Sequence, residues 1–224
     1  MVLEMSNYDL DFIAGANSFT SNIFYRDLVT STNDVAKEIA ASEEATLGNF
    51  LVLANAQTRG RGKNQVRYFS PPDVGIYMSA VIMRPAFELQ FLSMATGLAI
   101  SHAIKNVAAV ESKLKWPNDV LIDGKKVCGI LIESAARVSG AGLAHVVIGA
   151  GVNVNNTAFE PPIENIATSL RMASGQAINL SALVVEILNS LQNLLESDPE
   201  AALDAYLRSL DEKSREAFSI KRFR

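Results

Sequence analysis

The sequence predicts an α+β domain with a mixed, mostly antiparallel sheet and helices on one face. Two observations lead to this class. Apolar runs of strand length follow one another more often than they alternate with helical stretches. Asp123-Gly124 stands between two such runs, and an Asp-Gly pair favours a type I′ hairpin because that turn needs positive φ at both central residues. With 224 residues, 49% of them hydrophobic, the chain can bury a core without metals or disulfides.

The individual elements follow from apolar periodicity and from the residues that flank it. Ser31 is a favourable N-cap and Asp34 follows at near capping-box spacing, which predicts a helix over 31–41. Residues 56–73, rich in Gly, Pro and basic residues, are expected to form a long loop. The other expected elements are strands over 50–55, 75–83, 111–116, 119–122, 125–134 and 143–152, and helices over 88–109, 180–197 and 199–210. We place one catalytic domain over 1–210 and expect 211–224 to be a frayed tail or linker.

Charge and cysteine content narrow the class of protein. The formal net charge is −4 and the pI is about 5.3, so a nucleic-acid-binding surface over the whole protein is not expected. The one cysteine, Cys128, lies in an apolar run, cannot form an intrachain disulfide and is expected to be buried. The amino terminus shows no secretory leader and no run of 18 apolar residues occurs. We therefore expect a cytoplasmic protein with no DNA and no membrane partner.

Several common motifs do not fit. Residues 149–151 read Gly-Ala-Gly after a strand, but Val154 stands where a dinucleotide fingerprint needs its third glycine. Residues 60–63 lack the spacing of a P-loop, and His102 and His145 have no companion ligands for zinc. We expect neither nicotinamide, P-loop nor zinc chemistry.

Four polar segments point to the function. The first begins a predicted helix and the second lies in the predicted long loop. Residues 31–33 (STN) begin a helix, where they either cap it or bind a polar ring with hydroxyls and an amide. Residues 57–64 (QTRGRGKN) combine glycines, which let the backbone approach a ligand, with cations that bind anions. A solvated basic loop or an RG-type nucleic-acid contact would explain the second pattern equally well.

The other two segments lie near the predicted hairpin and at a strand end. Residues 115–119 (KWPND) and the pair 125–126 flank the Asp-Gly turn, so the folded hairpin brings lysines, an amide and a carboxylate together. Such a group suits phosphate oxygens and Mg²⁺, whereas a proline corner with exposed lysines is the plainer interpretation. Asn153 follows small residues and could bind an adenine edge through its amide.

In this order the segments resemble the biotin–protein ligases, also called biotin–[acetyl-CoA-carboxylase] ligases. The matching stretches are STN at 31–33, QTRGRGK at 57–63, KWPNDV at 115–120, GKKVCGILIE at 124–133 and GAGVN at 149–153. The resemblance implies the catalytic-domain fold of the biotin and lipoate ligases and two half-reactions. Biotin and ATP give biotinyl-5′-AMP and pyrophosphate, and a lysine of a biotin carboxyl carrier protein then takes the biotinyl group.

The resemblance also implies roles for the matching residues. Biotin would meet Ser31, Thr32 and Gln57 at its ureido ring, and Gly60, Arg61 and Lys126 along its tail and carboxylate. Asn33 and Gly129 would also belong to the biotin site. ATP would meet Arg61, Lys63, Lys115, Asn118, Asp119 and Asn153, with Asn153 at adenine and Asp119 at Mg²⁺. The catalytic set would be Lys126, Arg61, Lys115 and Asp119. Cations are needed because the first step joins two anions, and charge-assisted hydrogen bonds contribute on the order of 1.5–3 kcal/mol each.

The chain departs from the family pattern in the basic loop. Lys63 stands where the family has an arginine on the phosphate, Val66 replaces a basic residue and Tyr68 replaces a tryptophan. Lysine cannot hold a phosphate bidentately as arginine does, so we expect looser retention of biotinyl-AMP. Phe159 is the one aromatic residue in 155–168 that could lie over adenine.

Two appendages of the family are not expected here. About 30 residues precede Ser31, too few for an amino-terminal helix-turn-helix, and the chain ends soon after its last predicted helix, without the small carboxy-terminal barrel. The leading interpretation is a monofunctional ligase, with a homodimer left open. A lipoate or octanoate ligase, disfavoured by KWPND, and a biotin sensor without turnover are the alternatives.

Overall fold

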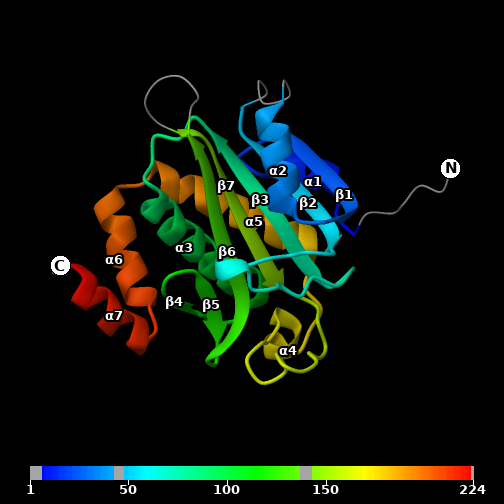
Figure 1. Ribbon diagram of the computed structural model, residues 1–224. Coiled ribbons are helices and arrows are strands. Elements are labelled where there is room, and N and C mark those ends of the chain that lie inside the picture. Colours follow the sequence, from blue (N-terminus) through cyan, green and yellow to red (C-terminus); the bar gives the residue numbers. More distant parts are fainter. Residues whose placement is uncertain (1–6, 43–47, 137–142, 223–224) are drawn as a thin grey trace.

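A seven-stranded sheet forms the centre of the computed structural model, which describes residues 7–42, 48–136 and 143–222 (Figure 1). In spatial order its strands are β1 (Ile23–Val29), β2 (Phe50–Gln57), β3 (Gly75–Met83), β7 (Leu143–Asn153), β6 (Lys125–Ala136), β5 (Asp119–Ile122) and β4 (Lys113–Lys115). β1 and β2 run parallel, and the other neighbouring pairs are antiparallel. The prediction of an α+β fold with a mixed, mostly antiparallel sheet is confirmed.

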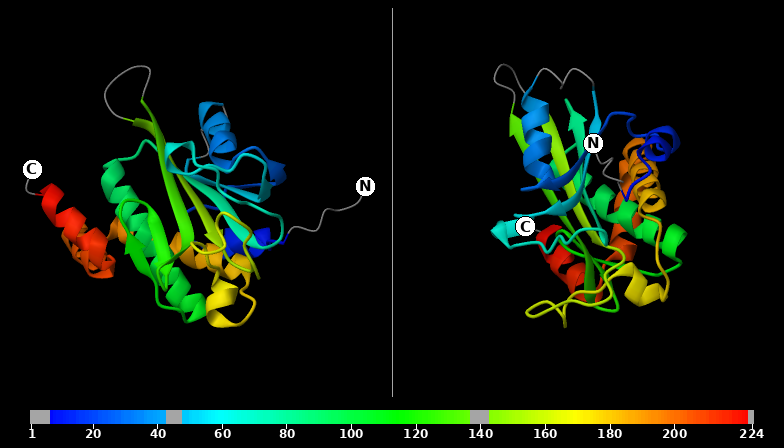
Figure 2. Two further views of the ribbon diagram at one scale, coloured as in Figure 1. Left: turned by 60° about the horizontal axis from the view of Figure 1, so that its bottom comes forward. Right: turned by 90° about the vertical axis from the view of Figure 1, so that its right-hand side faces the viewer.

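Helices cover the two faces of the sheet unequally (Figure 2). The larger layer consists of α3 (Leu89–Ala108) and α5 (Leu180–Glu196), with α1 (Leu10–Ala16) against α5 and α6 (Pro199–Ser209) against α3. α2 (Thr32–Ala41) packs on the opposite face, over β2, β3 and β7. The expectation of helices on one face holds for the larger layer, and α2 is the exception. No helix within the described ranges is long and apolar enough to cross a membrane.

Alternating side chains along the central strands explain why both faces are covered. In β2, Leu51 and Leu53 belong to the main core, whereas Phe50 and Val52 belong to a second cluster with Ile39 of α2. Successive side chains of a strand point to opposite faces, so an unbroken apolar run is buried on both. The apolar run therefore predicts the strand itself, and its second apolar face requires a helix such as α2.

α2 begins where it was expected but without the expected side-chain cap. The Ser31 backbone carbonyl accepts hydrogen bonds from the amides of Asp34 and Val35. The Ser31 hydroxyl makes no capping hydrogen bond, and its side chain is buried instead. Ser31 is thus the N-cap residue, as expected, but the expected capping box does not form, because Asp34 pairs with Arg61 and Lys37.

The β5–β6 hairpin has the turn that its sequence predicts. Asp123 has a φ of 48° and Gly124 a φ of 76°, so both central residues adopt positive φ. The register places Asp119 opposite Gly129 and Leu121 opposite Lys126, with an irregularity between Val120 and Leu121. The hairpin thereby brings the carboxylate at the start of β5 close to the lysine of β6.

The long loop between β2 and β3 is more ordered than its composition indicates. Arg61 and Arg67 form an antiparallel bridge around a short 3₁₀ turn, η2 (Lys63–Gln65). The Tyr68 amide donates to the Gly60 carbonyl at 2.7 Å, and the Gly62 amide donates to the Val66 carbonyl at 2.8 Å. The loop thus folds back on itself as a small hairpin beside the sheet.

The carboxy-terminal segment corrects the expectation of a frayed tail. Residues Glu212–Arg222 form α7, which contacts β4 (Figure 1). The Asp211 amide donates to the Leu114 carbonyl at 2.9 Å, and the Trp116 amide donates to the Ser214 hydroxyl at 2.9 Å. Mixed charges suggested a solvated linker, but a helix needs only one face to pack, and Ser214 is buried there. Residues 223–224 lie outside the described ranges, and the proposed division at residue 210 stays a prediction.

The apolar pattern of the sequence does not reveal three elements. α1 and α4 (Leu170–Ser174) are only 7 and 5 residues long, too short to show a helical period. β1 is an edge strand with Arg26 and Asp27 exposed in its middle, so it lacks an apolar run. By contrast, the prediction that Cys128 is buried is confirmed, and this burial raises the pKa of its thiol.

Two glycine substitutions should have opposite effects on stability. Gly124→Ala places a side chain at a φ of 76°, which should lower the free energy of unfolding by about 1 kcal/mol. Gly15→Ala, inside α1 and with open space around the new methyl group, should raise it by about 0.5–1 kcal/mol. Urea denaturation of both variants measures this difference. Equal effects would show that backbone conformation does not limit the hairpin.

Candidate functional site

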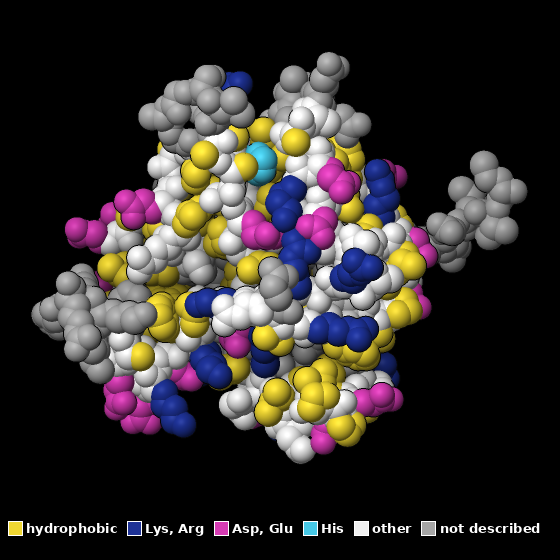
Figure 3. All heavy atoms as spheres, viewed as in Figure 1, with side chains coloured by type: hydrophobic (Ala, Val, Ile, Leu, Met, Phe, Trp, Pro, Cys, Tyr) yellow, Lys and Arg dark blue, Asp and Glu magenta, His cyan; other side chains and the backbone are white. Residues whose placement is uncertain are grey.

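A polar pocket lies where the amino terminus of α2, the 58–70 loop and the middle of β6 and β7 meet. Its space is about 420 Å³ with its open mouth included. On this side of the molecule, Lys and Arg side chains gather in the centre of the face with acidic side chains among them (Figure 3). The pocket is lined by Ser31, Thr32, Asn33, Gln57, Arg61, Gly62, Tyr68, Asn118, Lys126, Gly129, Ile130, Leu131, Gly149, Ala150 and Gly151.

Glycines on β6 and β7 form the floor of this pocket because other side chains lie directly on them. A Cβ at Gly149 would collide with the Asn33 side chain, and a Cβ at Gly151 would lie 2.5 Å from the Tyr68 ring. A Cβ at Gly129 would lie 3.0 Å from Lys126 Nζ. Glycine is required at 149 and 151 for close approach, as the sequence analysis expected for 129.

The inner end of the pocket is a set of fixed polar groups. The Thr32 amide, at the first turn of α2, donates to Gln57 Oε1 at 2.9 Å. Gln57 Nε2 donates to the Ser70 hydroxyl at 2.9 Å. Ser31 and Thr32 are each only 3% exposed. The structure therefore brings together the three residues that the sequence analysis placed around the ureido ring: Ser31, Thr32 and Gln57.

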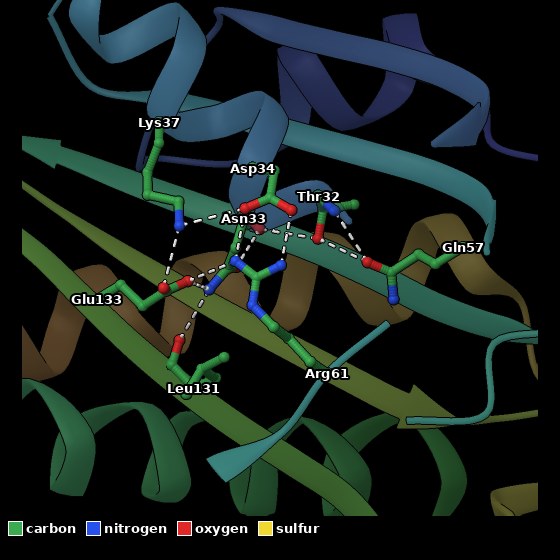
Figure 4. A network of polar contacts seen from close by, with 9 residues as sticks. Thr32, Asn33, Asp34, Lys37, Gln57, Arg61, Leu131 and Glu133 are labelled. Atoms are coloured by element: carbon green, nitrogen blue, oxygen red, sulfur yellow. Dashed lines mark hydrogen bonds and ion pairs between the residues drawn. The ribbon is translucent and has the colours of Figure 1, made fainter. Parts of the chain in front are cut away.

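Asn33, also expected to bind biotin, uses its whole amide in contacts with the protein (Figure 4). Its Oδ1 accepts from the Ser79 hydroxyl at 2.6 Å, and its Nδ2 donates to Glu133 Oε2 at 2.8 Å. Sequence reasoning missed Ser79, although a lone hydroxyl in the apolar run of β3 is the signal that could have found it. Asn33 holds α2 against the sheet, and a direct ligand contact stays a prediction.

Arg61 crosses the pocket to a pair of carboxylates (Figure 4). Its guanidinium donates to both oxygens of Asp34, at 2.5 and 2.6 Å, and lies 3.4 Å from Glu133 Oε2. Lys37 pairs with the same two carboxylates, at 3.2 Å from Asp34 and 3.0 Å from Glu133. This network fixes the cation that the sequence analysis assigned to the biotin tail and the phosphate.

The charges of this network shift the pKa values of its members. The Arg61 hydrogen bonds lower the pKa of Asp34, and Asp34 in turn raises the pKa of Arg61. Burial alone would raise the pKa of Glu133, but hydrogen bonds from Asn33 and Lys37 outweigh it and the pKa is lowered. All three groups are therefore held in their charged forms at neutral pH.

Lys126 and Asp119 form the second charged centre. Lys126 Nζ lies 2.6 Å from Asp119 Oδ1, with the two side chains 35% and 20% exposed. The backbone of Lys126 is fixed from outside the sheet, because its amide donates to Ile166 and its carbonyl accepts from Thr168. The predicted convergence of a lysine and a carboxylate across the hairpin is observed.

Two asparagines of the predicted ATP site act as braces in the structure. Asn118 Nδ2 donates to the Ile130 carbonyl at 3.0 Å, which ties the proline corner to β6. Asn153 Nδ2 donates to the Thr168 carbonyl at 3.0 Å, and its Oδ1 lies 3.2 Å from the Tyr68 hydroxyl oxygen. Asn153 also lines an adjoining, mostly apolar pocket with Lys126, Ile163, Ile166 and Ala167.

Other predicted residues lie at or beyond the edge of the pocket. Lys63 and Lys115 are exposed, do not line it and make no side-chain hydrogen bond or ion pair within the described part of the chain. Gly60 is buried, and a Cβ there would lie 2.9 Å from Gln57 Nε2. Phe159 is buried as well, rather than free to cover a ligand.

Tyr68 stands where the family usually has tryptophan, and it closes one side of the pocket. Its hydroxyl donates to the Gly151 carbonyl at 2.7 Å, and burial raises its pKa well above the usual value. The side chain therefore remains a neutral hydrogen-bond donor, and it separates the polar pocket from the adjoining apolar one.

Comparison with known sequences identifies related proteins. The profile of the "Biotin/lipoate A/B protein ligase family" matches residues 25–153. The "Bifunctional ligase/repressor BirA" of Bacillus spizizenii is 35% identical over 190 residues, which are 83% of this chain and 57% of that protein. The "Biotin--[acetyl-CoA-carboxylase] ligase" of Mycobacterium tuberculosis is 30% identical over 84% of this chain and 72% of its own. The chain thus spans little more than half the length of several curated relatives.

Solved structures agree with this result. The Aquifex aeolicus biotin protein ligase in complex with biotin and ATP has a TM-score of 0.72 and 26% identity, over 84% of this chain and 78% of that one. The Leishmania major enzyme in complex with biotinyl-5-AMP has a TM-score of 0.71 and 25% identity, over 86% and 82%.

Acid should weaken the network around Arg61. A carboxyl group whose pKa is lowered on folding stabilises the protein at pH values above its ordinary pKa, which is 3.8 for Asp34 and 4.5 for Glu133. This stabilisation is lost as the pH falls through the pKa of the folded state. Asp34→Asn should therefore lose less stability than the wild type as pH falls from about 5 to about 2. Asp204→Asn, at an exposed position, is the control and should follow the wild type. Urea unfolding at each pH measures this, and parallel curves for all three proteins would contradict it.

Proposed function

Because the chain belongs to the biotin/lipoate A/B protein ligase family, we propose that it is an ATP-dependent biotin–protein ligase. The observation that carries the proposal is the arrangement of one pocket, in which fixed polar groups at the inner end face two cationic centres. Thr32 and Gln57 form the polar end, and Arg61 and Lys126 the cationic sides. A ligand with a polar ring and a carboxylate tail matches this order of groups.

The proposed reaction has two half-reactions. In the first, a carboxylate oxygen of biotin attacks the α-phosphorus of ATP, and the bond to pyrophosphate breaks. In the second, a carrier lysine amine attacks the acyl carbon of biotinyl-5′-AMP, the bond to AMP breaks, and the amine loses a proton. No nucleophile from the chain is needed, because the substrates supply both.

The residues of the site would assist mainly by charge and position. The first step brings two anions together, and we assign to Lys126 on β6 the contact with both the carboxylate and the α-phosphate. Arg61 is preorganised by Asp34, and Lys63 and Lys115 are exposed cations that could reach the outer phosphates. The second step requires orientation of an amine against a mixed anhydride, and positioning can supply several kcal/mol of that barrier.

The residues also fit an Mg²⁺ ion bound together with ATP. Asp119 Oδ1 is buried and accepts no aligned hydrogen bond within the described ranges, although Lys126 Nζ lies 2.6 Å from it, so it could serve as a ligand that Mg²⁺ shares with or takes from Lys126. Mg²⁺ commonly uses one or two carboxylates together with substrate phosphates and water. When bound, the ion would neutralise phosphate charge. Asp119 would hold it, and could also help to take the proton of the incoming lysine.

We propose that the acceptor is a biotin carboxyl carrier protein or domain and that the protein acts in the cytoplasm. The names of the relatives support the acceptor. We propose no DNA partner, in keeping with the net charge of −4, and leave a homodimer open.

Biotin-dependent exchange of pyrophosphate into ATP tests the first half-reaction. With Mg²⁺ present, biotin should support exchange, and lipoate and octanoate should not. Exchange with a fatty acyl ligand alone would assign the protein to lipoate chemistry. Biotin binding without any exchange would indicate a sensor.

Lys126→Ala should abolish the first half-reaction while leaving the fold intact. Loss of a cation that contacts two anions should lower the exchange rate at least about 100-fold. Because the side chain is about one-third exposed, the free energy of unfolding should change by less than about 1 kcal/mol. Lys125→Ala is the matched control, since Lys125 is an exposed neighbour that does not line the pocket. Near wild-type exchange by Lys126→Ala would remove Lys126 from the mechanism.

A further inference from the structure

Ser79 is a polar residue in the middle of an apolar strand, and it does not line the pocket. It lies on β3 with 0% exposure, on the face covered by α2. Its Oγ is 2.6 Å from Asn33 Oδ1 and 2.9 Å from Thr32 Oγ1. A buried hydroxyl has one proton to donate and two lone pairs, so the direction of each hydrogen bond can be deduced from its neighbours.

The direction of these hydrogen bonds is set by the groups on the other side of Asn33, which can only accept. Asn33 Nδ2 faces the Glu133 carboxylate at 2.8 Å and the Leu131 carbonyl at 3.4 Å. Neither group can donate, because the lowered pKa of Glu133 keeps its carboxyl group ionised. The amide nitrogen of Asn33 must therefore face them, and its oxygen must face Ser79. Since that oxygen also only accepts, Ser79 gives it its single proton.

Thr32 must then be the donor to Ser79. The Ser79 oxygen has lone pairs available, and Thr32 Oγ1 is the hydroxyl at 2.9 Å. The other acceptor within reach of Thr32 is Gln57 Oε1, at the longer distance of 3.3 Å, and that oxygen already accepts from the Thr32 amide. With its proton used inside the protein, Thr32 can only accept on the side of the pocket.

We propose that Ser79 is a positioning residue that fixes Thr32 as a hydrogen-bond acceptor, so that the pocket selects a ring bearing N–H donors. This inference rests on the proposed function and deepens it. Thr32 Oγ1 and Gln57 Oε1 both present acceptor lone pairs at the inner end, which matches the N–H groups of a cyclic urea. The dithiolane ring of lipoate has no N–H group and would leave both acceptors unpaired, which is costly in a buried site.

Calorimetric titration of the full chain with biotin tests this role. Ser79→Ala should raise the Kd for biotin about tenfold, the effect of one lost or misdirected hydrogen bond. Desthiobiotin, which keeps the cyclic urea, should lose affinity by the same factor. At saturating biotin the rate of pyrophosphate exchange should stay within about twofold, because Ser79 acts on ring binding. Ser79→Thr, which keeps the hydroxyl, should restore the affinity.

Two controls separate positioning from general destabilisation. Ser190→Ala removes another buried hydroxyl, on α5 and away from the pocket, and should leave the Kd unchanged. In a Thr32→Val background, Ser79→Ala should add less than about twofold, because the two residues act in series. If Ser79→Ala unfolds, Ser79→Cys keeps the volume with a weaker donor and should give an intermediate Kd.

The outcomes are distinguishable. A wild-type protein that does not bind biotin would overturn the proposed function. Two outcomes would overturn this inference alone, provided that the wild type binds biotin. One is an unchanged Kd for biotin in Ser79→Ala, and the other is full additivity of the effects of the Ser79 and Thr32 substitutions on the binding free energy.

Discussion

The contact between the amino terminus of α2 and the glycines of β7 is the constraint on which the rest of the site depends. Asn33 lies on Gly149 so closely that no side chain fits beneath it. This approach brings the first turn of α2, with Ser31 and Thr32, down to the sheet. It also places Asp34 where it can hold the guanidinium of Arg61. A larger residue at 149 would displace α2 from the sheet. Ser31, Thr32 and Asp34 would then all lose their positions in the site at once.

The cations of the site are paired with carboxylates before any substrate is present. Arg61 is held by Asp34 and Lys126 by Asp119, in pairs that are partly exposed. Such pairs restrict the rotamers of long side chains, which reduces the entropy lost when a ligand binds. An anionic ligand must therefore displace the carboxylate from the cation, or bind the cation beside it. The arrangement therefore combines preorganisation with an electrostatic cost that the phosphates and an accompanying Mg²⁺ would have to offset.

Features encoded by local rules could be predicted from the sequence, and those set by tertiary contacts could not. Asp123-Gly124 gives its turn because positive φ is a property of those two residues. The convergence of Lys126 and Asp119 follows from hairpin geometry alone. Ser31, in contrast, is a good N-cap by type, yet its side chain is buried at the pocket instead of capping the helix.

Residues that act through contacts distant in sequence were harder to find. Ser79 has no motif, because its role depends on a helix that begins 47 residues earlier in the chain. The packing of α7 on β4 was missed because a mixed-charge sequence does not reveal which partner surface is available. Lys115 matches the family motif and Lys63 stands where the family has an arginine, but both lie outside the pocket, since a motif specifies a residue and not its distance from a ligand.

The contact between Gly149 and Asn33 also limits how this protein can change over evolutionary time. Position 149 cannot accept a larger residue while Asn33 is retained, so the two positions are coupled although they are 116 residues apart in the chain. A lineage could enlarge residue 149 only after shortening residue 33, and that step would release Ser79 and Glu133 from their partner. A larger residue at 149 on this fold would therefore come only with the loss of a helix anchor.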